Sequence, residues 1–377
     1  MEIIFLASVF LIFYVYLGYP VLLFILQRLF KNPPVMNSAT YEPTVSIIIA
    51  AYNEEKHIAT RLRNLLSLDY SREKLEIIVA SDGSSDRTAA IARRYPGVTV
   101  VDFPKNRGRA EVHNDSARIA RGEILVFTDA ETEFSADFLT RIVQPFSNPK
   151  IGCTVGNLIY NNTDGPISAS EGFYFRMEKR LRYWESRLGL LATGTGACMA
   201  VRKRLWRNLG PKEDCDFTTP LDVILQGFNI EFAPEAIAYD VPASSLRAEF
   251  RTRIRQTSRN LIGTLQRWGW EGWLRYPIVS LGLLSHKILR WFTPFFMIKI
   301  FILNFLLLNE GTVYRILLMG QMFFYMMVII GLIANVFQKR IAIASLISSF
   351  CVANLGMGIG VILGLAGKAQ ASYKKST

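Results

Sequence analysis

The stretch GEILVFTDAE, residues Gly122 to Glu131, contains the pattern on which the fold prediction depends. Ile124 to Phe127 form a continuous apolar run, with a glycine before it and acids after it. Such a run is typical of a strand that is buried on both faces. Alternate residues of an extended chain share a side, so Asp129 and Glu131 can point the same way. Two carboxylates there suit a hard divalent cation that carries phosphates, although a solvated acidic turn would show the same pattern.

Short apolar runs alternate with helical patterns on both sides of this stretch. Strands are expected at 45–51, 75–80, 98–101 and 123–128, and helices at 55–66, 86–95 and 109–120. Strict alternation of strand and helix predicts an α/β domain, in which helices cover a mostly parallel sheet.

Polar residues follow each expected strand, and ligands of open parallel sheets bind at the carboxyl ends of the strands. These segments are Tyr52-Asn53-Glu54-Glu55, Ser81 to Asp86, Lys105 to Arg109, and Asp129 with Glu131. One polar turn would be ordinary loop chemistry, but four at one edge indicate a binding site. The chain has no Gly-x-Gly-x-x-Gly and no Walker lysine loop, which disfavours a dinucleotide enzyme or a phosphate-loop ATPase.

The composition points to a membrane protein. Of the 377 residues 50% are hydrophobic, and the apolar residues gather at the two ends of the chain. The net charge of +12 fits the basic cytoplasmic flanks of membrane proteins or a phosphate-bearing substrate. No nucleic-acid-binding motif is present. The four cysteines lack a metal-ligand spacing, so a reducing compartment is expected.

Apolar stretches and their flanks suggest six segments. We expect a transmembrane anchor at 1–30, a linker at 31–43, a catalytic domain at 44–268 and an interfacial amphipathic helix at 269–290. Transmembrane helices at 291–367 and a tail at 368–377 would follow. A signal peptide is the rival for the first segment, but Glu2 and the long apolar core disfavour it. Basic residues after this span predict an inner-membrane protein whose middle domain lies in the cytoplasm. Four spans would then place both chain ends outside.

The motifs together carry a resemblance to a known family. Val45 to Glu54, Ser81 to Asp86, Asn106 to Ala110 and Asp129-Ala-Glu131 resemble the motifs of family 2 glycosyltransferases with the Rossmann-like GT-A fold. Further along, Asp214-Cys-Asp216, Gln256-Thr-Ser-Arg259-Asn260 and Ser285 to Trp291 are similar to motifs of membrane-bound exopolysaccharide members. The resemblance thus covers nearly the whole chain.

The resemblance implies a role for each motif. Asp82 would hold the base or ribose of a nucleotide-sugar donor such as a uridine diphosphate sugar, and the donor would also be bound by Tyr52, Asn53, Glu54 and Arg109. Asp129, with Glu131, would bind Mg²⁺ or Mn²⁺ on the diphosphate. Asp216 would be the general base for the acceptor hydroxyl, with Asp214 as its rival. Gln256 and Arg259 would close over donor and acceptor.

Three departures from the family pattern bear on function. Ser81 stands where the family often has an aspartate, Glu131 is longer than the usual aspartate, and Asn260 replaces a tryptophan that processive synthases use. The expected function is transfer of a sugar to a lipid-linked or membrane-embedded acceptor, in exopolysaccharide or glycolipid synthesis. A processive polysaccharide synthase and an inert nucleotide-sugar-binding scaffold are the alternatives.

Overall fold

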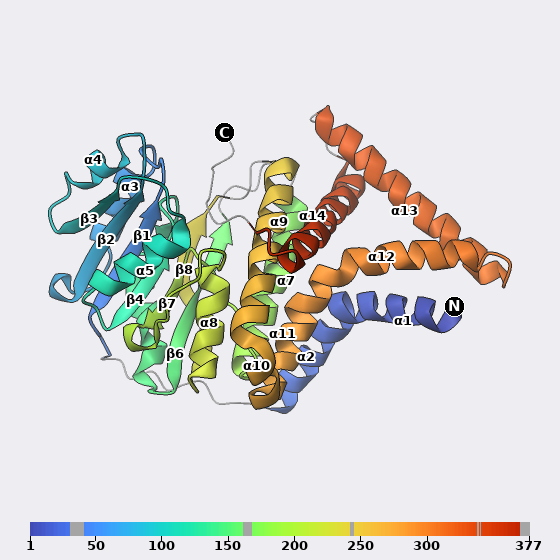
Figure 1. Ribbon diagram of the computed structural model, residues 1–377, viewed down its shortest axis with the longest axis horizontal. Coiled ribbons are helices and arrows are strands. Elements are labelled where there is room, and N and C mark those ends of the chain that lie inside the picture. The colour runs from blue at the N-terminus through green and yellow to red at the C-terminus, as the bar shows by residue number, and fades with distance from the viewer. Residues whose placement is uncertain (31–40, 161–167, 242–244, 338, 340, 370–377) are drawn as a thin grey trace.

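The computed structural model describes residues 1–30, 41–160, 168–241, 245–337, 339 and 341–369. A sheet with its covering helices forms one side of the molecule, and long apolar helices form the other (Figure 1). Two helices of the domain, α7 (Ser168–Arg187) and α9 (Leu246–Gly263), stand between the two parts. The expected linker at 31–43 falls mostly, and the tail at 368–377 almost wholly, outside the described residues.

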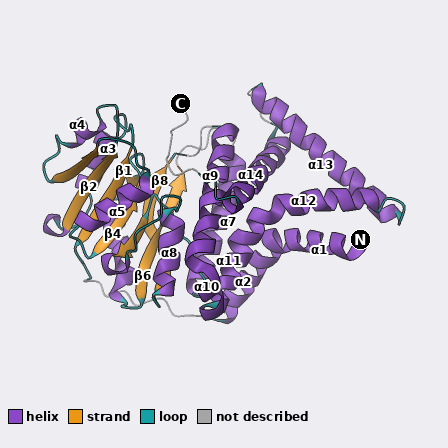
Figure 2. Cartoon of the chain, in the orientation of Figure 1, coloured by secondary structure: helices purple, strands orange, loops and turns teal. Residues whose placement is uncertain are grey.

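Eight strands form one sheet in the order β3-β2-β1-β4-β7-β6-β8-β5 (Figure 2). The first half is parallel: β1 (Val45–Ala51) lies between β2 (Leu75–Asp82) and β4 (Ile124–Thr128), and β3 (Val98–Phe103) is at the edge. The second half is mixed, with β7 (Met199–Arg202) antiparallel to β4. The remaining strands are β5 (Glu133–Phe134), β6 (Ile151–Tyr160) and β8 (Asn229–Asp240). The α/β prediction is confirmed.

Strand β4 is buried on both faces, as its continuous apolar run predicts. Ile124 and Val126 belong to one hydrophobic core, whereas Leu125 and Phe127 belong to the core on the opposite face. All four are fully buried. Helices cover both faces of the sheet: α3 (Ile58–Leu66), α4 (Thr88–Ala92), α5 (Arg109–Ile119), α6 (Phe138–Val143) and α8 (Cys215–Leu225).

Within the described residues, four helical runs are long and apolar enough to cross a membrane. The first, Glu2–Leu29, joins α1 (Glu2–Phe13) to α2 (Tyr19–Leu29). The second, Pro277–Leu306, joins α11 (Pro277–Leu283) to α12 (Leu289–Leu306) through a π-helical segment. The third and fourth are α13 (Thr312–Val336) and α14 (Ala342–Leu365). One N-terminal and three C-terminal spans were predicted. Helix α10 (Gly269–Arg275) precedes the second span, so helical structure over 269–290 is broken at Tyr276.

Helix α14 packs along α9 of the catalytic domain (Figure 1). A Cβ on Gly360 would lie 2.9 Å from the Ile254 carbonyl oxygen, and one on Gly364 would lie 3.0 Å from that of Ser258. Only glycine allows the backbones to approach this closely. This contact accounts for the glycine-rich sequence of α14.

The end of α14 corrects the expected topology. Lys212 of the catalytic domain donates a hydrogen bond of 2.7 Å to the Gly367 carbonyl oxygen. The described C-terminal residues therefore lie beside the domain, and the expectation that both chain ends are on the opposite side is wrong for this end. A topology prediction from the number of spans assumes that each helix crosses the membrane completely. Here the close packing on α9 brings the end of α14 to the domain.

Candidate active site

The loops that follow β1 and β2 are bonded to each other. Asn53, whose φ of 56° is in the left-handed region, accepts a 2.9 Å hydrogen bond from the Ser85 amide through Oδ1. Its own amide donates to Ser84 Oγ at 3.1 Å, and the Glu54 amide donates to Thr88 Oγ1 at 2.8 Å. The half-buried Tyr52 directly precedes Asn53. Three of the expected nucleotide-binding residues thus lie on a loop fixed against the Asp-Gly-Ser turn.

Asp82 holds the next loop at the same edge of the sheet. Its carboxylate accepts hydrogen bonds from the amides of Arg107, at 2.7 Å, and Gly108, at 2.9 Å. Gly108 has a φ of 93°, a left-handed conformation that favours glycine. Asp82 is buried, and its two hydrogen bonds fix the segment that leads into α5. Each carboxylate oxygen has a second lone pair, so these bonds are compatible with a ligand contact as well.

Arg109, in the first turn of α5, forms an ion pair with Asp129 at the end of β4. The expected nucleotide contact and the expected metal ligand are thus direct neighbours. Behind them Arg61 is fully buried and donates a 2.7 Å hydrogen bond to Thr128 Oγ1. Burial lowers the pKa of Arg61 to about 9. Arg61 could not be recognised from the sequence, because it looks like an ordinary polar position on a helix.

Side chains that could bind a cation lie close to Glu131. Ligand atoms of Glu54, His57 and Glu131 lie within 4.8 Å of one another, and Glu131 is exposed. Asp129 is two residues away at the strand end. Carboxylate oxygens with one imidazole are ligands that Mn²⁺ accepts, so the residues present fit a divalent ion. His57 was missed, and its spacing of three residues after Glu54 is the only sequence signal for it.

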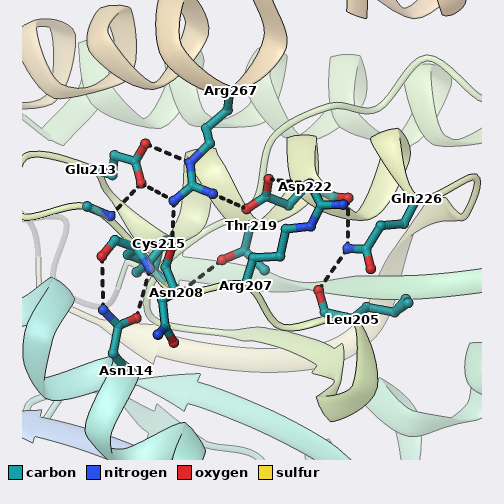
Figure 3. A network of polar contacts seen from close by, with 12 residues as sticks. Asn114, Leu205, Arg207, Asn208, Glu213, Cys215, Thr219, Asp222, Gln226 and Arg267 are labelled. Carbon is teal, nitrogen blue, oxygen red and sulfur yellow. Dashed lines mark hydrogen bonds and ion pairs between the residues drawn. The ribbon is translucent and has the colours of Figure 1, made fainter. Parts of the chain in front are cut away.

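The acidic cluster at 213–216 is held by two arginines. Arg267 donates to both carboxylate oxygens of Glu213, at 2.8 and 2.7 Å (Figure 3). Arg259 Nε lies 2.8 Å from Asp214 Oδ1, and both residues are largely buried. Burial raises the pKa of Asp214, an effect that Arg259 opposes. Two of the three acids in the cluster are therefore occupied by arginines.

Arg267 also reaches a second buried acid. Its Nη1 lies 3.4 Å from Asp222 Oδ2, and Asp222 is 1% exposed (Figure 3). Burial raises the pKa of Asp222 to about 6. Because Arg267 lies in the π-helical segment Thr264–Trp268 that continues α9, this network ties α9 to both ends of α8.

Asp216, in the first turn of α8, borders a cavity of about 300 Å³. Its carbonyl oxygen accepts a 2.6 Å hydrogen bond from the Gly194 amide, which fixes the glycine-rich loop beside it. A Cβ on Gly196 would lie 3.7 Å from Asp216 Cγ and 3.8 Å from Arg109 Nη1. Arg109 and Asp216 therefore flank Gly196, which links the strand-end site to the cavity.

The cavity has one wall from the domain and one from the membrane helices. Gln256 and Asn260 of α9 line it, as do Lys287, Arg290 and Trp291 of the second span and Met357 of α14. Arg259 is not among the lining residues, because its side chain is turned toward Asp214. Of the three expected catalytic residues, Asp216 and Gln256 thus share a cavity that Arg259 does not line.

Comparison with known proteins agrees with this arrangement. The structure is similar to a mannosyltransferase from Pyrobaculum calidifontis that was solved with GDP-Man and Mn²⁺, with a TM-score of 0.73 and 21% sequence identity over 97% of this chain and 99% of that chain. At this identity the likeness defines the fold, which is the GT-A fold of glycosyltransferases. The sequence profile of glycosyl transferase family 2 matches residues 46–210. The chain thus contains a domain that matches this family, as the motifs predicted.

Two curated relatives have more specific names. A poly-beta-1,6-N-acetyl-D-glucosamine synthase of Staphylococcus epidermidis is 27% identical over 222 residues, which cover 56% of this chain and 53% of that protein. An N-acetylglucosaminyltransferase of Bradyrhizobium diazoefficiens is 25% identical over 269 residues, which cover 64% and 55%. The chain therefore spans about half the length of the curated relatives it matches.

Proposed function

We propose that the protein is a membrane-anchored, inverting glycosyltransferase that moves a sugar from a nucleotide-sugar donor to a lipid-linked or membrane-embedded acceptor. The observation that carries the proposal is the position of Asp216. It borders a cavity whose opposite wall is built by membrane helices, whereas Glu213 and Asp214 are each paired with an arginine. An acceptor that enters from the membrane side would meet Asp216.

The donor would bind at the carboxyl ends of the parallel strands. Tyr52, Asn53, Glu54 and Asp82 would hold the nucleoside of a donor such as a uridine diphosphate sugar. Asp129 and Glu131 would hold Mg²⁺ or Mn²⁺, which when bound supplies positive charge next to the diphosphate. Arg109 lies against Asp129, so its guanidinium would stabilise the negative charge that develops on the leaving diphosphate.

Transfer then needs a base on the acceptor side. The Asp216 carboxylate would take the proton of the acceptor hydroxyl as the new bond to the sugar C1 forms and the nucleoside diphosphate leaves. Gln256, on the same cavity, would orient the acceptor or donor sugar. Arg259 would act indirectly, because its ion pair with Asp214 fixes the start of α8 that carries Asp216.

One observation favours a second candidate function. The relative from Staphylococcus epidermidis is named as a polysaccharide synthase, so repeated transfer to a growing chain is a candidate here. Asn260, which lines the cavity where processive family members use a tryptophan, favours single transfer instead. The alternative of an inert nucleotide-sugar-binding scaffold is disfavoured, because Asp216 lines this cavity.

The proposed location is the inner membrane, with the catalytic domain in the cytoplasm, where nucleotide sugars are made. Arg28 at the end of the first span supports this orientation, because basic residues collect on the cytoplasmic side.

The test is incubation of membranes containing the protein with a panel of radiolabelled nucleotide sugars, followed by extraction and mass analysis of lipid-soluble products. One donor should label a lipid product, and a short product would favour single transfer over processive synthesis. Donor binding with neither hydrolysis nor transfer would indicate a scaffold.

A further inference from the structure

Four cations line the cavity from α7 and the second span. Lys179 and Arg182 come from α7, and Lys287 and Arg290 come from the second span at and just after its π-helical segment. We call these four the membrane-side cations. Segments more than a hundred residues apart in sequence bring them together, and all four line the cavity that also contains Asp216.

A single carboxylate, that of Glu178, lies among these cations in the described cavity lining. Glu178 Oε1 is 2.6 Å from Lys287 Nζ and 3.7 Å from Arg182 Nε, and its Oε2 is 3.1 Å from Arg290 Nη1. Burial would raise the pKa of Glu178, but Lys287 and His286 hold it well below its usual range. Glu178 thus carries one negative charge against four positive ones.

His286 also contacts Glu178. Its Nε2 lies 3.0 Å from Glu178 Oε2 and its Nδ1 lies 2.8 Å from Glu185 Oε1, and all three residues are buried. Glu178 is therefore shared among His286, Lys287 and Arg290.

The rest of the described lining does not supply the missing negative charge. Arg253 is paired with Glu249 at 3.3 Å, and Asp216 lies at the domain side. Over the whole lining the five Lys and Arg side chains exceed the three carboxylates by two. An excess of positive charge along a cavity favours the binding of an anion.

We propose that the membrane-side cations bind the phosphate or diphosphate that joins the acceptor's lipid to its polar head. A phosphate group of about two negative charges matches the surplus, and arginine and lysine are its usual partners. Trp291, Phe217 and Met357 line the same cavity and provide an apolar surface for the first carbons of the lipid. This inference rests on the proposed function, in which the acceptor's hydroxyl reaches Asp216.

The experiment measures binding of defined probes to the full-length protein in neutral detergent. Geranylgeranyl phosphate, geranylgeranyl diphosphate and geranylgeraniol share one chain and differ only in phosphate content. We expect at least one phosphorylated probe to bind about tenfold or more tightly than the alcohol, the effect of one or more charge-assisted hydrogen bonds. Phosphatidylglycerol at equal concentration should not compete. Equal binding of all three probes, or full competition by phosphatidylglycerol, would overturn the inference.

Variants locate the binding site. Lys287→Gln should lose most of the preference for phosphate, and Lys179→Gln, an exposed position whose change does not disturb packing, should weaken it several-fold. Lys299→Gln is the matched control, because Lys299 is exposed on the same span and does not line the cavity. A phosphate preference unchanged in both Lys287→Gln and Lys179→Gln would also overturn the inference.

Failure of this inference can be told apart from failure of the proposed function. If the wild-type protein transfers sugar to a lipid product yet shows no phosphate preference, only the inference fails. If it prefers the phosphorylated probes but neither hydrolyses nor transfers any donor, the proposed function fails and the anion site remains.

Discussion

Arg259 Nε lies 2.8 Å from Asp214 Oδ1 at the start of α8, and this pair separates the roles of two neighbouring acids. Asp214 is tied to an arginine, whereas Asp216, two residues further on, borders the cavity. Both were candidates for the general base. The pairing supports a structural role for Asp214 and the proposed role of Asp216 as the general base.

Asp216→Asn is therefore expected to lower the transfer rate by roughly 10²- to 10⁴-fold, the usual effect of losing a general base. Donor affinity should survive, because Asp82 and Asp129 are unchanged. Asp214→Asn should cost much less transfer, because Asp214 is paired with Arg259 and does not line the cavity. Transfer rate, nucleotide affinity by calorimetry and apparent Tm are measured on both variants. Loss of transfer in Asp214→Asn alone would reverse the assignment.

The ion pair between Arg109 and Asp129 leads to a prediction about metal. Asp129→Ala should abolish transfer at any practical Mg²⁺ or Mn²⁺ concentration, while Glu131→Ala should leave a remnant that depends on metal, since Glu54 and His57 lie beside it. Metal titrations of the transfer rate, with chelator as the blank, distinguish the two variants. Full wild-type activity in excess EDTA would contradict the assignment of Asp129 as a metal ligand.

The raised pKa of Asp222 predicts how the stability of the fold depends on pH. Burial raises the pKa of Asp222 to about 6 in the folded protein, above the 3.8 of an unperturbed aspartate. Because the folded state holds the proton more tightly, the fold loses stability as pH rises from about 4 to 6, and the loss stays constant above that range. This difference between the folded and unfolded pKa corresponds to about 3 kcal/mol.

The matching variant is Asp222→Asn, which keeps the shape without the charge. Its apparent Tm, followed by tryptophan fluorescence in detergent, should exceed that of the wild type at pH 8 and approach it near pH 4. A wild type that is the more stable protein at pH 8 would mean that the attraction of Arg267 outweighs the effect of burial.

The position of α14 predicts an unequal accessibility of two loops. A cysteine at Asn309, between the second and third spans, should react with an impermeant maleimide added to intact cells. One at Lys368 should react only after permeabilisation, because Gly367 is bonded to the catalytic domain. Three native cysteines are buried and Cys351 is half-buried, so background labelling should be low. Labelling of Lys368 in intact cells, with Asn309 protected, would contradict this arrangement.

Most of the sheet could be predicted from sequence because its signals are local. The run at Ile124 to Phe127 needs only its own residues to indicate a doubly buried strand, and the polar residues after each strand follow from the parallel order. The shorter second half of the sheet was less clear, since β6 and β8 are parallel neighbours separated by two helices in the chain. No local periodicity encodes such a pairing.

The partners of the site residues could not be predicted. Arg259 was expected near the substrates, but which acid it meets depends on how α9 packs against α8. The same holds for Arg109 with Asp129, and for His286 between Glu178 and Glu185. Each pair joins segments that are distant in sequence, so a motif gives the residue type and the fold decides its contact. The roles of these residues in binding and catalysis stay predictions.

The close approach of α14 to α9 has a practical consequence for protein engineering. A common way to obtain a soluble enzyme is to delete its hydrophobic segments, but here Gly360 lies against the helix that also carries Gln256. A chain ended ahead of Ala342 would expose to solvent a surface of α9 shaped for another helix. It would also lose Met357 from the cavity wall. The hydrophobic segments form part of the cavity that Asp216 borders, and a useful recombinant form has to keep them.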